Sequence, residues 1–205
     1  MKLFLAPGAC SLSPHIALHE AGLKFEAVRV DFLTKLTADG RDFNVINPKG
    51  YVPALQLDNG YVLTEGPAIL QFIADQAPGL HLAPPNGTLE RYKLQEWLGF
   101  INSELHKVYG PLFNPKANEE AKTAARNNLL RRFGFVAHAL EDKQWLMGDA
   151  FTVADCYLYV MLVWSKYTGV DLSGTPVLAA YQARVEARPA VRAALAAENA
   201  LRTRK

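Results

Sequence analysis

A proline- and glycine-rich segment at residues 78–87, Pro-Gly-Leu-His-Leu-Ala-Pro-Pro-Asn-Gly, divides the chain into two parts with different hydrophobic periodicity. On its N-terminal side, short apolar runs alternate with helical patterns. On its C-terminal side, nearly every segment has helical spacing. We therefore predict an α/β domain at residues 1–77, a linker at 78–87 and an all-helical domain at 88–205.

The N-terminal part has the order βαβ, a long connection, then ββα. Ser13 followed by Pro14 is typical of a helix N-cap and first helical residue, and Asn59-Gly60 is a strong hairpin signal. This order predicts a mixed four-stranded sheet with helices packed on it. Strands are expected at residues 2–5, 25–30, 52–57 and 61–63, and helices at 11–21 and from Gly66 onward.

The C-terminal part is expected to be helical throughout. Apolar residues recur at three- and four-residue steps from Leu94 to Leu112, which predicts one long amphipathic helix. Further helical stretches are expected at residues 119–141, 153–167 and 176–202.

The charge balance and the cysteine count exclude several classes of protein. The 22 basic and 20 acidic side chains give a net charge of +2, which argues against a protein that binds nucleic acid through phosphate contacts. The two cysteines exclude a disulfide-stapled secreted scaffold. The N-terminal apolar run is too short for a signal peptide, and the run from Cys156 to Trp164 is too short for a membrane helix. We expect a cytoplasmic protein that binds neither nucleic acid nor membrane.

Cys10 lies where the first predicted strand has ended and the first helix begins. A thiol at a helix N-terminus is near free backbone N–H groups, which favour the thiolate. The alternative is a small buried hydrophobe, which is our interpretation of Cys156 in its apolar run. Because the sequence has no Cys-x-x-Cys pair, redox chemistry at Cys10 would need an external thiol.

Two further segments could bind a ligand. Pro53 begins a predicted strand, where a trans proline is the simpler interpretation from the residues alone. A cis bond after Val52 would instead direct the backbone of Val52 toward an extended ligand. Glu65 and Gly66 lie at a predicted helix N-terminus, which can hold a carboxylate while Glu65 attracts an amine. From this residue alone, a favourable N-terminal charge is the simpler explanation of Glu65.

Five segments, in order, resemble the glutathione transferases, most closely the bacterial beta class. The resemblance covers the whole chain and implies a thioredoxin-like α/β domain that binds glutathione, followed by the all-α domain. Thr152 and Asp155 match the family's capping box, in which Asp155 reaches back to the Thr152 N–H. The segments are Pro7-Gly8-Ala9-Cys10-Ser11, Asn47-Pro48-Lys49-Gly50 with Val52-Pro53-Ala54-Leu55, Thr64-Glu65-Gly66, Glu104-Leu105-His106-Lys107 and Thr152-Val153-Ala154-Asp155.

The resemblance implies roles for residues of the first domain. Cys10 is similar to the beta-class cysteine that contacts the glutathione sulfur and can form a mixed disulfide with it. Val52 resembles the residue whose backbone pairs with the cysteinyl part of glutathione, followed by a cis Pro53. Glu65 and Gly66 resemble the pair that holds the γ-glutamyl amine and carboxylate. Lys35 matches a basic residue that contacts glutathione.

In the helical domain, the resemblance implies that Ser103, His106 and Lys107 line the glutathione site. His106 and Lys107 are expected to add hydrogen-bond donors or positive charge near the sulfur atoms. For His106, a catalytic role and a purely structural hydrogen bond both remain open. Aromatic residues that could face the electrophile, or could instead belong to the core, are Tyr109, Phe113 and Trp164.

The chain departs from the family at several positions. Gly66 replaces a common serine, so only its N–H can serve, and Gly99 replaces an asparagine usual in the beta class. The first strand has no tyrosine, Tyr51 stands where glutamine is common, and Ser11 and Ser13 could donate to the sulfur.

The expected function is that of a homodimeric glutathione transferase with the site near the subunit interface. It would conjugate glutathione, its co-substrate, to a hydrophobic electrophile. A thiol–disulfide or dehalogenating reaction in which Cys10 itself attacks is an alternative within enzymes. A non-catalytic glutathione-binding or interaction protein is the alternative outside them. No His, Cys or carboxylate cluster has metal-ligand spacing, so no metal is expected.

Overall fold

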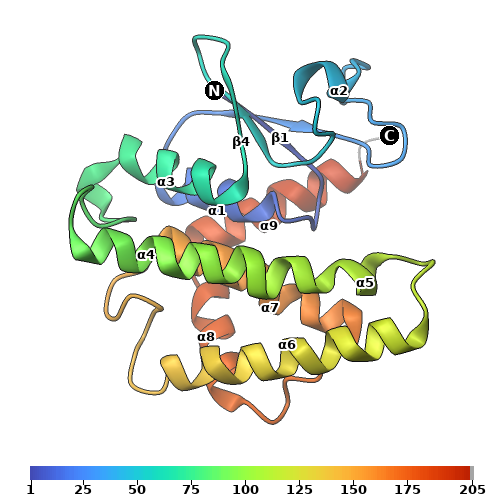
Figure 1. Cartoon of the computed structure of the whole chain (residues 1–205). Helices are drawn as coiled ribbons and strands as arrows, with labels where there is room; N and C mark the ends of the chain where they lie inside the picture. Colours follow the sequence, from blue (N-terminus) through green and yellow to red (C-terminus); the bar gives the residue numbers. More distant parts are fainter. Residues whose placement is uncertain (204–205) are drawn as a thin grey trace. The chain divides into compact units, whose positions relative to one another are not determined.

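The computed structural model describes residues 1–203, which form two compact units (Figure 1). The first unit comprises residues 1–83 together with the described chain from Ala187 onward, and the second comprises Pro84–Glu186. The expected combination of an α/β region and a helical region is confirmed. The end of the chain, which the sequence places in the helical domain, packs in the α/β unit instead.

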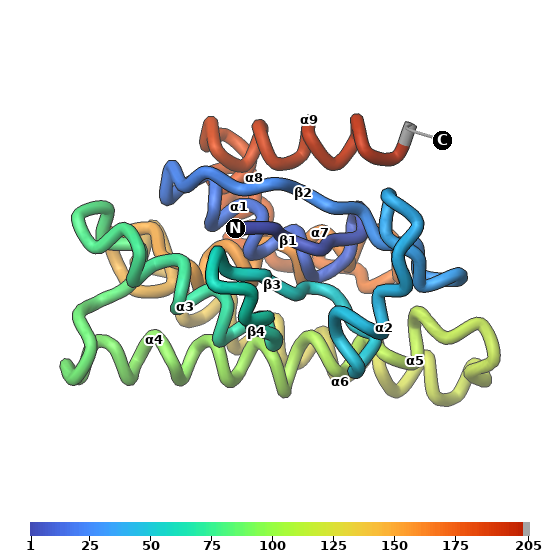
Figure 2. The backbone as a smooth tube through the Cα atoms, turned by 90° about the horizontal axis from the view of Figure 1, so that it is seen from above, coloured from blue at the N-terminus to red at the C-terminus, as the bar shows by residue number. Residues whose placement is uncertain are grey.

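The first unit is built on a mixed four-stranded sheet, as expected. The strand order is β2-β1-β3-β4 (Figure 2), with β1 parallel to β2 and antiparallel to β3, and with β3 antiparallel to β4. A turn at Asp58-Asn59-Gly60 joins β3 to β4, and Gly60 there has a φ of 85°, which favours glycine. The strands are β1 (Lys2–Leu5), β2 (Glu26–Arg29), β3 (Ala54–Gln56) and β4 (Val62–Thr64).

Helices cover both faces of this sheet. In Figure 1, α1 and α3 lie on one side of the strands and α2 on the other. Leu3, Phe4 and Leu5 are all fully buried, because the central strand β1 is covered on both faces. Phe4 packs against Phe43 of α2, with the ring centroids 5.7 Å apart. The helices of this unit are α1 (Leu12–Glu20), α2 (Phe43–Ile46), α3 (Gly66–Gln76), the 3-10 turn η1 (Pro78–Leu80) and α9 (Pro189–Thr203).

The N-cap of α1 differs from the prediction. The helix begins at Leu12, so Ser13 lies inside the first turn and is not the N-cap. The Ser13 hydroxyl donates to the Cys10 carbonyl at 2.8 Å. Pro14 is also in this first turn, where a missing N–H leaves no helical hydrogen bond unmade. The turn that carries Cys10 therefore leads directly into the helix.

Helix α9 packs on α1 and is held there by polar contacts. The Glu198 carboxylate is buried and accepts from the Gly8 N–H at 2.7 Å, while its other oxygen lies 3.3 Å from Nδ1 of His15. Arg188 forms a bidentate pair with Glu20 at 2.6 and 2.8 Å. A buried carboxylate is stable only with such partners. These contacts fix α9 against the turn that precedes Cys10.

The second unit is helical, but two expected helices are interrupted. The predicted helix from Leu94 to Leu112 remains helical but widens into a π-turn and then tightens into a 3-10 turn. The predicted stretch 176–202 breaks before Pro189, which cannot donate a backbone hydrogen bond. Within residues 1–203, no helix is both long and apolar enough to cross a membrane. The elements are α4 (Leu89–Phe100), the π-turn η2 (Ile101–Leu105), the 3-10 turn η3 (His106–Tyr109), α5 (Gly110–Phe113), α6 (Glu119–Ala139), α7 (Val153–Thr168) and α8 (Pro176–Glu186).

The predicted capping box at the start of α7 is present. Oδ2 of Asp155 accepts from the Thr152 N–H at 2.8 Å and from the Thr152 hydroxyl at 3.0 Å. Oδ1 accepts from the Leu146 N–H at 2.9 Å and from the Tyr181 hydroxyl at 2.7 Å. Burial raises the pKa of Asp155, and these four donors act in the opposite direction. The box therefore joins α7, α8 and the loop before α7.

We predict that Thr152→Ala lowers the free energy of unfolding by about 0.5–2 kcal/mol, because it removes one donor from a buried carboxylate. Urea titration measures the change. Thr123→Ala, at an exposed position inside α6, is the matched control and should change stability by less than about 0.5 kcal/mol. Equal effects of the two substitutions would contradict the role of the cap.

Candidate functional site

Cys10 lies in the turn between β1 and α1. Its Sγ donates a hydrogen bond to the Val52 carbonyl at 3.3 Å, so residues 42 positions apart are neighbours. Cys10 is partly exposed, whereas Cys156 is fully buried in α7, as predicted. A thiol can donate this bond and a thiolate cannot. The Cys10 thiol thus lies against the backbone segment that precedes β3.

The segment before β3 is held in place by a buried asparagine. The Asn47 amide donates to the Tyr51 carbonyl at 2.7 Å, and its oxygen accepts from the Lys49 N–H at 3.2 Å. The Val52–Pro53 peptide bond is cis, as the resemblance implies and contrary to the simpler interpretation of the residues alone. The Val52 N–H has no hydrogen-bond partner within residues 1–203. A free backbone donor therefore lies beside the Cys10 thiol.

Glu65 and Gly66 form the N-terminus of α3. Glu65 has a φ of 69°, and its carbonyl accepts from the Ala68 and Ile69 N–H groups at 3.1 and 3.0 Å. The Gly66 N–H has no partner in the described part of the chain. An unpaired N–H at the positive end of a helix favours an anion, while the Glu65 side chain beside it favours a cation.

Two lysines approach the same segment. Lys35 Nζ donates to the Gly50 carbonyl at 3.1 Å. Lys49 Nζ lies 2.7 Å from the Glu65 carboxylate and 3.1 Å from the Thr64 hydroxyl. Sequence reasoning quoted Lys49 within a motif but did not assign it to the site, because its partner is 16 residues away. In the first unit, Cys10 contacts Val52 and Lys35 contacts Gly50. Lys49, from the same segment, contacts Glu65 at the start of α3.

His106 belongs to the second unit and is partly buried among aromatic side chains. Its Nδ1 lies 2.6 Å from the Tyr157 hydroxyl, and its ring contacts the rings of Tyr157 and Trp164 edge-on. Burial, and to a smaller extent the charge of Lys107, lowers the pKa of His106 to about 4. His106 is therefore uncharged at neutral pH, so of the donors or positive charge expected from His106 and Lys107, the charge does not come from His106.

The remaining predicted residues of the second unit differ in exposure. Ser103 and Lys107 are exposed on the same helical segment as His106, and the Ser103 hydroxyl donates to the Gly99 carbonyl at 3.0 Å. Tyr109 is fully buried and donates to the Met161 carbonyl at 2.7 Å. Trp164 is also buried.

Among the three predicted electrophile-facing aromatics, Phe113 is 51% exposed and the other two belong to the core of their unit. Sequence reasoning missed Asn102 and Tyr157, which form a hydrogen-bonded chain with His106.

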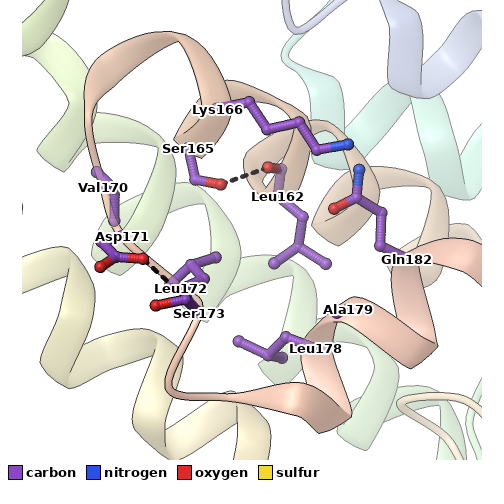
Figure 3. A pocket seen from close by; sticks show the side chains of 10 residues that line it. All are labelled: Leu162, Ser165, Lys166, Val170, Asp171, Leu172, Ser173, Leu178, Ala179 and Gln182. Atoms are coloured by element: carbon purple, nitrogen blue, oxygen red, sulfur yellow. Dashed lines mark hydrogen bonds between the residues drawn. The ribbon is translucent and has the colours of Figure 1, made fainter.

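A hollow of about 300 Å³ lies between α7, α8 and the segment that joins them (Figure 3). Two of its polar side chains are bonded within the lining: the Ser165 hydroxyl to the Leu162 carbonyl, and the Asp171 carboxylate to the Ser173 N–H. None of the predicted site residues lines it. Among the described residues, no group of three or more His, Cys, Asp or Glu side chains could hold a metal ion.

Two family descriptions match consecutive parts of the chain. "Glutathione S-transferase, N-terminal domain" matches residues 1–75, and "Glutathione S-transferase, C-terminal domain" matches residues 100–189. The chain belongs to the glutathione S-transferase family, in its bacterial beta class. Family membership agrees with the mixed sheet, the cis proline and the partly exposed cysteine described above.

Individual transferases resemble the chain over almost its whole length. The Escherichia coli O157:H7 glutathione S-transferase GstA is 46% identical over 198 residues, which cover 97% of this chain and 98% of that protein. A sphingomonad glutathione S-transferase solved in complex with glutathione is 51% identical, with a TM-score of 0.95 and coverage of 97% and 99%. A beta-class transferase from Sphingomonas chungbukensis is 52% identical, with a TM-score of 0.94 and coverage of 97% and 98%.

The lowered pKa of His106 predicts a pH dependence of stability. Between pH 6.5, the ordinary value, and about pH 4, the unfolded chain binds a proton at this position that the folded protein does not. Stability should therefore fall across this window as the pH is lowered, by up to about 3 kcal/mol from this residue.

Urea titrations at several pH values should show that His106→Gln loses less stability across the window than the unsubstituted protein. His138→Gln, at an exposed position, is the control and should keep the original pH dependence. The same slope in all three proteins would show that His106 is not desolvated.

Proposed function

We propose that this transferase binds glutathione in the unit that carries Cys10 and transfers the glutathione sulfur to an apolar electrophile. The contact between the Cys10 thiol and the Val52 carbonyl carries this proposal. It places a thiol that can contact the sulfur of glutathione next to a residue whose backbone N–H is unpaired and can bind an extended ligand. The sphingomonad relative solved with glutathione supports it. In the reaction, the glutathione thiolate forms a bond to an electrophilic carbon, and the leaving group departs with its bonding electron pair.

The polar groups of the first unit complement the charges of glutathione, which has one ammonium group and two carboxylates. Glu65 would bind the ammonium, and the Gly66 N–H would bind the adjacent carboxylate at the start of α3. Lys35 would bind the second carboxylate, and the backbone of Val52, ahead of Pro53, would pair with the cysteinyl residue. From the second unit, we propose that Ser103, His106 and Lys107 also contact glutathione.

Glu65→Gln should weaken glutathione binding by about 10- to 100-fold, since a charge-assisted hydrogen bond contributes roughly 1.5–3 kcal/mol. Stability should change little, because the ion pair of Glu65 with Lys49 is exposed. Isothermal titration with glutathione measures the effect. Glu26→Gln, which breaks another exposed ion pair in the same unit, is the control. An unchanged dissociation constant for Glu65→Gln would refute the assignment.

A second reaction is favoured by the exposure of Cys10. We propose that its thiolate attacks glutathione disulfide, forms a mixed disulfide and releases one glutathione thiolate. Cys156 is fully buried and should not react. This chemistry suits the cytoplasm, where thiols are kept reduced.

Cys10→Ala should abolish thiol exchange and the mass increase of one glutathione, while conjugation to an aromatic halide is retained in part. Conjugation should persist because a backbone N–H can still stabilise the thiolate of glutathione; the Ser11 hydroxyl, which the sequence offered for this role, is fully buried and donates to the Ala6 carbonyl. Cys156→Ala is the control and should keep both activities. If Cys10→Ala left both unchanged, the residue would have no part in the mechanism. Glutathione binding without any conjugation by the unsubstituted protein would favour the non-catalytic alternative.

We also propose that two copies associate through the aromatic surface of α4 and α6. Phe135 packs on Trp97 and Phe100, yet it remains 54% exposed, and Tyr92 is 60% exposed. Exposed aromatic side chains on neighbouring helices are typical of an interface.

Light scattering at micromolar concentration should give a mass near twice the 22.6 kDa of the chain. Phe135→Glu should reduce the mass to that of one chain, whereas Tyr167→Glu, at another exposed aromatic position, should not. A single-chain mass for the unsubstituted protein would exclude the dimer.

A further inference from the structure

Lys49 is bound to the carboxylate that we assign to the ammonium of glutathione. Its Nζ lies 2.7 Å from Oε1 of Glu65 and 3.1 Å from the Thr64 hydroxyl. Within residues 1–203, no other side chain bonds the Glu65 carboxylate. The ammonium of a lysine and that of a γ-glutamyl group carry the same charge, and each has three N–H donors. The protein therefore holds a cation of its own where the cation of the substrate is expected to bind.

The turn at residues 47–50 fixes the backbone from which Lys49 extends. The Lys49 N–H donates to Oδ1 of the buried Asn47 at 3.2 Å, and the Gly50 N–H donates to the Asn47 carbonyl at 2.8 Å. Gly50 has a φ of 67°, a conformation that favours glycine. This turn leads into the segment that would pair with the cysteinyl backbone. The position of Lys49 beside Glu65 is thus set by the site itself.

The contact between Lys49 and Glu65 is open to exchange. Their side chains are 53% and 62% exposed, and an ion pair at this exposure is weak because water competes with it. Glu65 directly precedes α3, whose positive N-terminal end disfavours a cation. The ammonium of glutathione arrives with an adjacent carboxylate that this helix end favours, whereas Lys49 does not. An incoming γ-glutamyl group can therefore replace Lys49.

We propose that Lys49 determines how strongly this site selects for a free amino group. The inference rests on the proposed function, in which Glu65 binds the ammonium of glutathione. A thiol peptide with a free ammonium replaces Lys49 at Glu65. When a thiol peptide without that ammonium binds, Lys49 stays in place, so the carboxylate keeps a cation. The site thereby accepts a second class of substrate, thiol peptides that resemble glutathione but lack a positively charged amino group.

Isothermal titration with two thiols measures this selectivity. Glutathione is compared with its desamino analogue, glutaryl-cysteinyl-glycine, in which hydrogen replaces the ammonium. The dissociation constant of the analogue relative to that of glutathione should rise about two- to fivefold in Lys49→Met, the affinity equivalent of an exposed ion pair. The reason is that the analogue then leaves Glu65 without a cation. Lys49→Arg keeps the cation and should keep the original ratio. Lys2→Met, which breaks the exposed pair with Glu26 in the same unit, is the matched control and should also keep it.

A double substitution separates the contact from the general charge of Lys49. The analogue has one more net negative charge than glutathione, so long-range attraction by Lys49 is a competing explanation. In the Glu65→Gln background, Lys49→Met should change the ratio by less than about 1.5-fold at an ionic strength of about 0.15 M, where long-range attraction is largely screened. The carboxylate for which both cations compete is then absent. An equal rise of the ratio in both backgrounds would show that the contact does not set the selectivity, and the proposal would be wrong.

Steady-state conjugation to an aromatic halide tests the substrate class. The unsubstituted protein should conjugate both thiols, and Lys49→Met should lower kcat/KM for the analogue, relative to glutathione, by about the same two- to fivefold. Conjugation of glutathione alone would refute the inference. So would an unchanged binding ratio in Lys49→Met, while glutathione binding by the unsubstituted protein would still uphold the proposed function. If the unsubstituted protein bound neither thiol, the proposed function would fail, and the inference with it.

Discussion

The first unit depends on the hydrogen bonds that the buried carboxylate of Glu198 accepts. A charged group without water is costly unless donors replace its hydration, and here the Gly8 N–H and the His15 ring do so. These donors belong to the turn and helix on either side of Cys10. The burial of Glu198 and the shape of the Cys10 turn therefore depend on each other. Because Glu198 belongs to α9, the first unit is built from residues 1–83 together with a helix more than 100 residues later in the sequence.

The second unit has the same arrangement around Asp155. Its carboxylate is satisfied by four donors from the cap, the preceding loop and α8, and it fixes the first turn of α7. Tyr157 lies at the start of the next turn of α7, and its hydroxyl contacts the His106 ring. In each unit, a buried carboxylate with protein donors fixes a segment that leads to a group we assign to the site, Cys10 in the first and His106 in the second. This proximity gives the site a rigid support that loops alone would not provide.

The sequence predicted the features that depend on local signals. Strand positions, the Asn59-Gly60 turn and the Thr152–Asp155 box follow from residue types a few positions apart, and all are present. The N-cap of α1 was wrongly assigned to Ser13, because Ser13 and Pro14 also suit the inside of a first turn. The packing of α9 on α1 depends on contacts about 180 residues apart, such as His15 with Glu198, which periodicity does not encode. Lys49, Asn102 and Tyr157 were not assigned to the site for the same reason, since each contacts a partner that is distant in the sequence or lies on another element.

The two units bring different electrostatics to the proposed chemistry. In the first, Glu65 is already paired with Lys49, so an incoming ammonium exchanges one cation for another instead of neutralising an isolated charge. The affinity that Glu65 contributes is then the difference between the charge-assisted hydrogen bond to the ammonium and the exposed pair with Lys49 that it replaces. In the second, burial makes His106 neutral, so its ring adds no positive charge at neutral pH. Positive charge from this helical segment then depends on the exposed Lys107, so hydrogen bonding and charge are divided between two adjacent residues.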